Sequence, residues 1–111
     1  MIRLSRFDPE NAVKAHQNTI LASAVLPDGV KAPFEHAWGC LEHPGEMETH
    51  RHAKEEIYFF FKGEGYVTVD GERVRVRCGD VVYIPSDALH NVGNEKDETL
   101  LWAALWWPAQ K

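Results

Sequence analysis

Short apolar runs alternate with turn-forming residues along this chain, and this pattern is the first indication of its fold. The turn signals are Pro27-Asp28-Gly29, Pro44-Gly45, Lys62-Gly63-Glu64-Gly65, Asp70-Gly71 and Cys78-Gly79-Asp80. Because no segment of helical length shows a convincing helical period, the spacing predicts an all-β sandwich or barrel. One helical turn is expected in residues 8–14, with Asp8 as the N-cap and Pro9 at the first helical position.

The clearest predicted hairpin joins residues 66–69 to residues 72–77. The connecting pair Asp70-Gly71 favours a type I′ turn. In the second arm valines face one way and arginines face the other. These arginines, Arg73, Arg75 and Arg77, are interpreted as a solvated face, and an anion-binding role is the alternative.

Two predicted strands, residues 57–61 and residues 100–107, are apolar on both faces. A sheet face that lies in water should be polar, so the second apolar face of these strands needs a cover. We expect a homodimer packed sheet to sheet to supply that cover. The alternative is that the N-terminal segment folds over the exposed face.

Composition and charge narrow the class of protein. With 111 residues, 44% of them hydrophobic, the chain suits one domain with a real core. Its 12 basic and 17 acidic residues give a net charge of −5 without a basic cluster, which argues against nucleic acid or an anionic membrane as partner. No stretch approaches the roughly 20 apolar residues of a membrane span, and no signal peptide is apparent. Cys40 and Cys78 are isolated, so we expect free thiols in a reducing cytoplasm rather than a disulfide.

The spacing of histidines and a glutamate indicates a metal site. Alternate side chains of a strand share a face, so His50 and His52 would project together, with Cα atoms about 6.6 Å apart, and Arg51 would project away. Glu56 has the same parity, and a strand that continues or resumes through residues 55–58 would bring it inward, with Glu55 outward. Two histidines and a carboxylate suit iron, manganese, nickel or zinc and leave coordination positions open.

Two motifs resemble those of the cupin superfamily. The first is Gly45, four residues, His50-Arg51-His52, three residues, Glu56, six residues and Gly63; the second runs from Gly79 through Pro85 to His90 and ends with Asn94. The resemblance implies that His50, His52, Glu56 and His90 bind one divalent transition-metal ion per chain (Mn, Fe, Ni or Zn). Two departures are present: five residues usually follow the first glycine, and a glycine usually stands at the position of Asp87. Neither departure removes a ligand, and aspartate tolerates turn conformations.

The resemblance also implies the fold. It predicts a double-stranded β-helix, the jelly-roll barrel, as a single cupin domain over residues 1–111. Residues 1–15 would form an N-terminal arm or helical turn, and residues 34–107 would form the barrel core with both motifs.

Strand parity supplies candidates for the pocket beside the ion. Tyr58 and Phe60 share the parity of the ligands, and we expect them to line the pocket. His36 and Trp38 share parity on a probable strand over residues 34–42, as do Tyr66 and Thr68 on another, so these side chains are further candidates. His16 and His43 are expected at the surface. No serine or cysteine is placed with a histidine in a way that suggests a nucleophile.

Any chemistry is therefore assigned to the ion, which can polarise an oxygen ligand, activate a water or, as iron, activate dioxygen. The favoured hypothesis is a metal-dependent enzyme that isomerises, cyclises, cleaves or oxygenates a sugar, a keto acid or a similar oxygenated small molecule. The alternative is a non-catalytic module that senses a sugar or other small ligand through the metal. A scaffold with a vestigial site is the third possibility, and the fold does not decide among the three.

Overall fold

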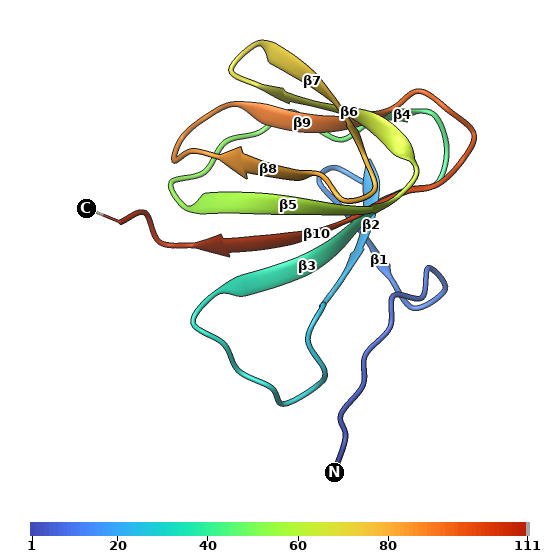
Figure 1. The fold of residues 1–111 in the computed structure, drawn as a ribbon, viewed down its shortest axis with the longest axis vertical. Coiled ribbons are helices and arrows are strands. Elements are labelled where there is room, and N and C mark those ends of the chain that lie inside the picture. Colours follow the sequence, from blue (N-terminus) through green and yellow to red (C-terminus); the bar gives the residue numbers. More distant parts are fainter. Residues whose placement is uncertain (111) are drawn as a thin grey trace.

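The computed structural model describes residues 1–110, which form ten strands in two antiparallel sheets (Figure 1). The six-stranded sheet has the order β1 (Val13–Ala15), β2 (Ile20–Ser23), β3 (Glu35–Leu41), β10 (Leu100–Trp107), β5 (Glu55–Lys62) and β8 (Val81–Ile84). The four-stranded sheet has the order β4 (Gly45–Glu46), β9 (His90–Asn94), β6 (Glu64–Val69) and β7 (Glu72–Arg77). None of residues 1–110 lies in a helix, so the all-β prediction is confirmed. In this part of the chain no helix is long and apolar enough to cross a membrane.

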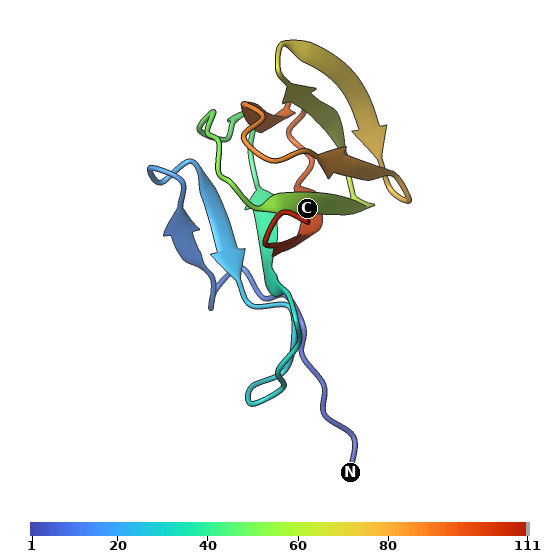
Figure 2. The same ribbon diagram turned by 90° about the vertical axis from the view of Figure 1, so that its left-hand side faces the viewer.

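The two sheets lie one above the other, and the core fills the space between them. Figures 1 and 2 show the smaller sheet, with β7 in yellow and β9 in orange, above β5 and β10 of the larger sheet. Ile84, Leu100 and Trp102 from the larger sheet and Val67 and Val92 from the smaller one are almost completely buried. Among the described residues the strands pair as two separate sheets rather than one closed ring, which is consistent with a jelly roll.

Strand β5 shows how the period of two selects the inner face. Glu56, Tyr58 and Phe60 are buried, whereas Ile57 and Phe59 between them are partly exposed. The neighbouring strand β10 aligns Ala104 with Tyr58 and Trp106 with Glu56. Since opposed residues of a pair point to the same face, the inner side of β10 carries its even-numbered residues.

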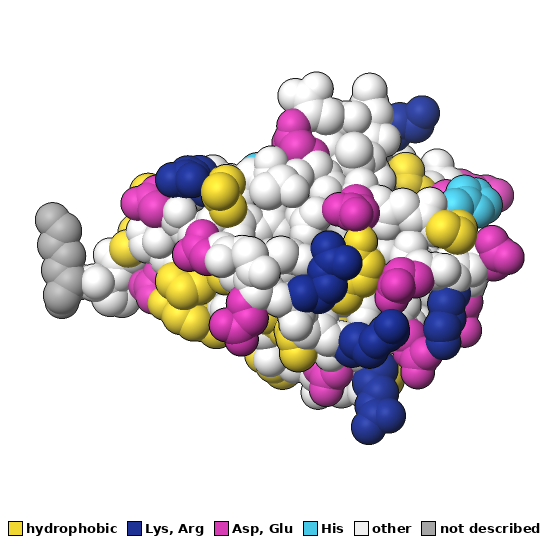
Figure 3. Space-filling view, turned by 90° about the horizontal axis from the view of Figure 1, so that it is seen from above, with side chains coloured by type: hydrophobic (Ala, Val, Ile, Leu, Met, Phe, Trp, Pro, Cys, Tyr) yellow, Lys and Arg dark blue, Asp and Glu magenta, His cyan; other side chains and the backbone are white. Residues whose placement is uncertain are grey.

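The predicted hairpin is confirmed as β6 and β7, with Val69 opposite Glu72. Asp70 and Gly71 have φ angles of 47° and 86°, as a type I′ turn requires. Arg73 lies over the ring of a tyrosine of β6, with its guanidinium carbon 3.8 Å from the ring centroid. Basic and acidic side chains are interspersed on the side of the molecule seen from above in Figure 3, so neither sign of charge dominates there.

The outer face of the six-stranded sheet is only partly covered. Phe7 of the N-terminal segment packs on Trp38, with ring centroids 6.1 Å apart, so this segment, the alternative to a homodimer as cover, contacts the outer face at this point. Farther along the same sheet, Phe61, Val81 and Tyr83 are 52%, 55% and 51% exposed. The expected helical turn is a single hydrogen-bonded turn in which Asp8 Oδ1 accepts from Glu10 N at 3.0 Å, and no helix follows it.

Candidate metal centre

The two motifs meet where β9 begins beside the segment that leads into β5. His50 and His90 form an isolated antiparallel bridge, with His90 N donating to His50 O at 2.9 Å and His50 N donating to His90 O at 3.1 Å. His52 O accepts from Asp87 N at 2.8 Å, which ties the second motif to the first. The expected strand through His50 and His52 is therefore reduced to one bridge, and a regular strand resumes only at β5.

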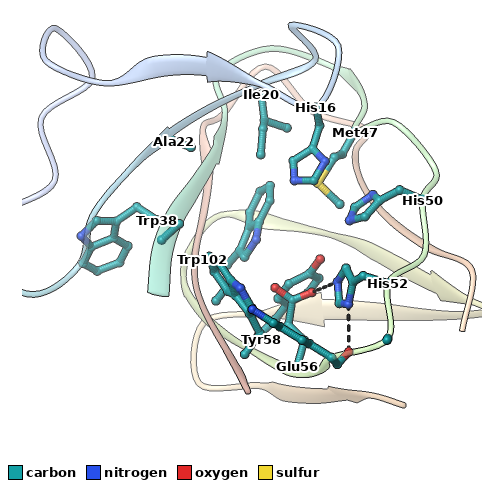
Figure 4. A pocket seen from close by; sticks show the side chains of 15 residues that line it. His16, Ile20, Ala22, Trp38, Met47, His50, His52, Glu56, Tyr58 and Trp102 are labelled. Atoms are coloured by element: carbon teal, nitrogen blue, oxygen red, sulfur yellow. Dashed lines mark hydrogen bonds and ion pairs between the residues drawn. The ribbon is translucent and has the colours of Figure 1, made fainter. Parts of the chain in front are cut away.

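Three histidine side chains, of His50, His52 and His90, and the carboxylate of Glu56 converge at this junction, and Figure 4 shows His50, His52 and Glu56. The ring of His50 lies 4.2 Å from that of His90 and 5.7 Å from that of His52, measured between centroids. Nitrogen atoms of these three histidines all lie within 4.8 Å of one another, which is close enough to hold one metal ion. Glu56 Oε1 lies 3.1 Å from His52 Nε2 and 3.4 Å from His90 Nε2.

The hydrogen bonds of the three rings fix which nitrogen is available. His50 Nδ1 donates to Glu48 O, His52 Nδ1 to Lys54 O and His90 Nδ1 to Ala88 O, each at 2.8 Å. A carbonyl oxygen can only accept, so each Nδ1 carries the hydrogen and each neutral ring keeps a lone pair on Nε2. Backbone carbonyls orient metal-binding histidines in the same way in other proteins.

His90 Nε2 tests whether these residues fit a metal. This atom is completely buried and makes no hydrogen bond among the described residues, although Glu56 Oε1 lies 3.4 Å away. A buried polar atom without a partner is costly unless a ligand occupies the position that it faces. Burial also lowers the pKa of His50, which favours the neutral form that binds metals. The set of nitrogen and oxygen donors suits a divalent transition metal.

The two polar neighbours in the first motif point elsewhere. Arg51 is exposed. Glu55 accepts hydrogen bonds from the Tyr83 hydroxyl and, at 3.1 Å, from Gln110 N. Its carboxylate is therefore held on the outer side of β5, away from the three histidines.

His50, His52 and Glu56 line a cavity of about 470 Å³, and His90 lies buried behind them. Tyr58 and Trp102 form part of its wall, and Ile20 and Met47 lie across the cavity from them (Figure 4). Trp106 also lines the cavity. Burial raises the pKa of Tyr58 well above its ordinary value, and the negative charge of Glu56 adds to this effect. The phenol therefore stays neutral at physiological pH.

The candidate pocket residues are divided between the cavity and other parts of the fold. Tyr58 lines the cavity, whereas Phe60 lies deeper in the core, 6.1 Å from the ring of Trp102. Trp38 reaches the cavity edge, but its indole points away from the histidines (Figure 4) and packs 5.3 Å from Phe61.

The other candidates have structural partners outside the cavity. His36 Nδ1 accepts from Val25 N at 3.0 Å, so this histidine braces the loop after β2. Tyr66 covers Gly93 on the outer side of the smaller sheet. On the same side, Thr68 accepts a hydrogen bond from Arg73 Nε at 3.1 Å. Strand parity correctly placed Tyr66 and Thr68 on one face of their strand, but it did not determine whether that face points inward.

His16 is exposed, as expected, and it also lies at the rim of the cavity. Its ring stacks on that of His50 at 4.1 Å, and its Nδ1 lies 3.9 Å from Glu48 Oε1. Burial lowers the pKa of His16, partly offset by the negative charge of Glu48. The turn between β1 and β2 places it there, and His16, Gln17 and Asn18 all have left-handed backbone angles. No local motif marks such a contact. His43 is also exposed, as expected.

The two departures from the expected motif are accommodated in the backbone. Asp87, which stands where a glycine is usual, has a φ of 63°, a left-handed angle that aspartate adopts more readily than most residues. Gly45 pairs with Asn94 at the start of β4, so the shorter spacing after it still leads into the smaller sheet.

Comparison with known proteins identifies a family. The Cupin domain family profile matches residues 39–108. A gentisate 1,2-dioxygenase from a Streptomyces species is 36% identical over 69 residues, which are 59% of this chain and 19% of that protein. The dimethylsulfoniopropionate lyase DddW from Ruegeria pomeroyi is 41% identical over 61 residues, 53% of this chain and 40% of that protein. The chain spans less than half the length of these curated relatives.

Solved structures agree on the fold over nearly the whole chain. A Cupin 2 conserved barrel domain protein from Salinispora arenicola superimposes with a TM-score of 0.85 at 30% identity, covering 98% of this chain and 91% of the other. A protein from Photorhabdus luminescens gives a TM-score of 0.86 at 26% identity, covering 96% of this chain and 88% of the other. The predicted jelly-roll fold is confirmed.

Proposed function

Because the chain belongs to the Cupin domain family, we propose that it is a metal-dependent enzyme acting on a small oxygen-containing molecule. His50, His52 and His90 would hold the ion through their Nε2 atoms, and Glu56 through its carboxylate. The observation that carries this proposal is that three Nδ1 atoms donate to backbone carbonyls, which leaves three converging lone pairs. A divalent ion bound here supplies Lewis acidity and open positions for oxygen ligands.

The residues around the proposed metal ligands would orient a substrate and exclude water from the cavity. The carboxylate of Glu56 is almost completely buried and lies beside two histidines, so it offsets the positive charge of a bound cation. Tyr58 remains a neutral hydrogen-bond donor beside that carboxylate. Trp102 and Trp106 exclude water from one side of the cavity and leave space in which a small substrate can be oriented.

The names of the relatives favour an enzyme over a sensor. Regions of this chain are similar to gentisate dioxygenases and to a dimethylsulfoniopropionate lyase. Both classes of enzyme act on small molecules, and we extend that general property to this chain. The particular reaction is not carried over, because one superfold hosts many chemistries.

Metal binding by the metal-free protein tests this proposal. After dialysis against a chelator, the protein should take up about one Mn²⁺, Fe²⁺, Ni²⁺ or Zn²⁺ per chain in calorimetry, and its melting temperature should rise. Glu56→Gln keeps the size of the side chain but removes its charge, so the affinity should fall. Failure of the chelated protein to bind any of these four ions would rule the proposal out.

We also propose that a second copy of the chain covers the exposed part of the larger sheet. Val81 and Tyr83 of β8 lie opposite Phe59 and Ile57 of β5, which places these apolar side chains on one continuous face. Phe61, Val81 and Tyr83 on this face are each about half exposed. An apolar face of this kind on a strand at the edge of a sheet is typical of an interaction surface.

A further inference from the structure

The cavity beside the four donors is mainly apolar. Its wall includes Ile20, Met47, Tyr58, Trp102, Ala104 and Trp106. The one lysine at its edge, Lys54, is hydrogen-bonded through its ammonium to the carboxylate of Glu35. Beyond the proposed ligands, the wall therefore has few polar groups free to bind a substrate.

One side of this cavity comes from a part of the chain that the family profile does not include. Ile20 and Ala22 of β2 line the cavity, and His16 lies at its rim, whereas the family match covers residues 39–108. This hairpin of β1 and β2 is fixed in place, because Thr19 Oγ1 accepts from Glu48 N at 2.9 Å. The wall that this hairpin adds therefore lies outside the region that the family profile matches.

The nature of the wall determines which substrates fit. A sugar or another polyol would bring several hydroxyl groups against alkyl and aromatic surface, where they would lose hydrogen bonds to water without replacement. An apolar body would instead release water from that surface and pack against it. The cavity volume of about 470 Å³ is sufficient for a ring-sized group.

We propose that the pocket selects small molecules with an oxygen-bearing head at the ion and an apolar, ring-sized body, and that the hairpin of β1 and β2 provides part of this selection. The proposal rests on the proposed function, because the head needs a bound ion. It excludes sugars from the substrate classes that the sequence left open.

Three hydroxy acids with the same head group test this selection. Mandelate carries a phenyl ring, glycolate carries no further group, and gluconate carries a polyol chain. Calorimetry with the metal-loaded protein should show mandelate binding about tenfold or more tightly than glycolate or gluconate, because only its body buries apolar surface. Metal content is measured on the same samples.

Substitutions in the cavity wall test which residues produce the preference for mandelate. Trp106→Ala should weaken mandelate binding several-fold and leave glycolate binding unchanged, and Trp107→Ala, on the outer face of the same strand, is the matched control. Ala22→Asn adds a polar group to the hairpin wall and should reduce the preference for mandelate, with Ser23→Asn as its control on the adjacent position. Circular dichroism spectra confirm that each variant is folded.

The outcomes separate the two proposals. Equal affinities for the three acids in metal-loaded protein, or no binding of mandelate, would overturn the selection while leaving the metal site intact. A preference for mandelate that Ala22→Asn does not alter would refute the role of the hairpin. Absence of bound metal would instead refute the proposed function, and the selection with it.

Discussion

Trp102 lies directly across the sheet from Gly39, and its indole occupies the space that a side chain at Gly39 would need. The two residues are paired in register between β3 and β10. A Cβ atom built on Gly39 would lie 2.6 Å from Trp102 Nε1 and even closer to two ring carbons, so any side chain there would collide with the indole. Since Trp102 forms both core and cavity wall, this glycine determines the shape of the pocket.

Gly39→Ala should therefore destabilise the protein. The buried indole must move into closely packed surroundings, which costs about 1–3 kcal/mol of unfolding free energy in urea denaturation. Combining it with Trp102→Phe, which removes part of the ring, should cost less than the sum of the two single changes. Strict additivity would show that the contact does not determine the packing.

His90→Ala should abolish metal binding. The variant loses a buried Nε2 donor, and metal content measured by mass spectrometry should fall from about one ion per chain to a small fraction of that. His52→Ala should do the same, whereas His43→Ala, an exposed histidine, is the matched control and should retain the ion. Full occupancy in His90→Ala or His52→Ala would refute the assignment of that ligand.

Asp87 should tolerate glycine better than alanine. Its φ of 63° is a left-handed angle in which an alanine Cβ is crowded and glycine is not. We expect the unfolding free energy of Asp87→Ala to lie about 1 kcal/mol below that of Asp87→Gly, measured in urea. An alanine variant as stable as the glycine variant would contradict the backbone assignment.

The two thiols should differ in reactivity. Burial raises the pKa of Cys40 from 9.0 to about 11, because the charged thiolate is disfavoured away from water. At pH 8 only about one Cys40 thiol in a thousand is then the reactive thiolate. Cys78 is exposed, so iodoacetamide at pH 8 should modify Cys78 alone in the folded protein and both cysteines in urea.

The direction of the same pKa shift also predicts a loss of stability in alkali. The unfolded chain releases the proton of Cys40 near its ordinary pKa and the folded chain only near 11, so this group disfavours the folded state as pH rises from 9 through 11. For the reactivity prediction, rapid modification of Cys40 by iodoacetamide in the folded Cys78→Ser variant would contradict the burial of this thiol.

Light scattering at micromolar concentration should give twice the monomer mass of 12.6 kDa. Val81→Glu places a charge on the exposed apolar face of β8 and should shift the protein toward the monomer. Val74→Glu is the matched control, because Val74 is 50% exposed but lies on β7 of the other sheet. A monomer in the unchanged protein would rule out the second copy as the cover.

The candidate ligands and the inner face of β5 could be predicted from the sequence for a physical reason. Alternation along a strand is fixed by backbone geometry, so Glu56, Tyr58 and Phe60 had to share a face. His90 was predicted as a ligand from the spacing of the second motif rather than from strand parity. The bridge between His50 and His90 shows that these distant segments meet through backbone hydrogen bonds.

The remaining pocket wall was beyond a reading of local patterns. Parity groups residues by face but does not say which face is inside when both are apolar, so it could not show that the Trp38 indole points away from the histidines at the cavity edge. His16 reaches His50 only because the hairpin of β1 and β2 packs against a distant segment, with Thr19 hydrogen-bonded to Glu48. Such a contact depends on tertiary packing rather than on the residues next to His16.

The carbonyl groups that orient the three imidazoles belong to the backbone of Glu48, Lys54 and Ala88. Every amino acid carries the same carbonyl, so the partly exposed positions Glu48 and Lys54 can vary without altering which nitrogens of His50 and His52 are free, whereas Ala88 is confined by the core. The side chains of Glu48 and Lys54 can therefore be substituted, both in evolution and by design. The charge at the mouth of the pocket can be exchanged there to suit a new substrate while the imidazoles keep their orientation.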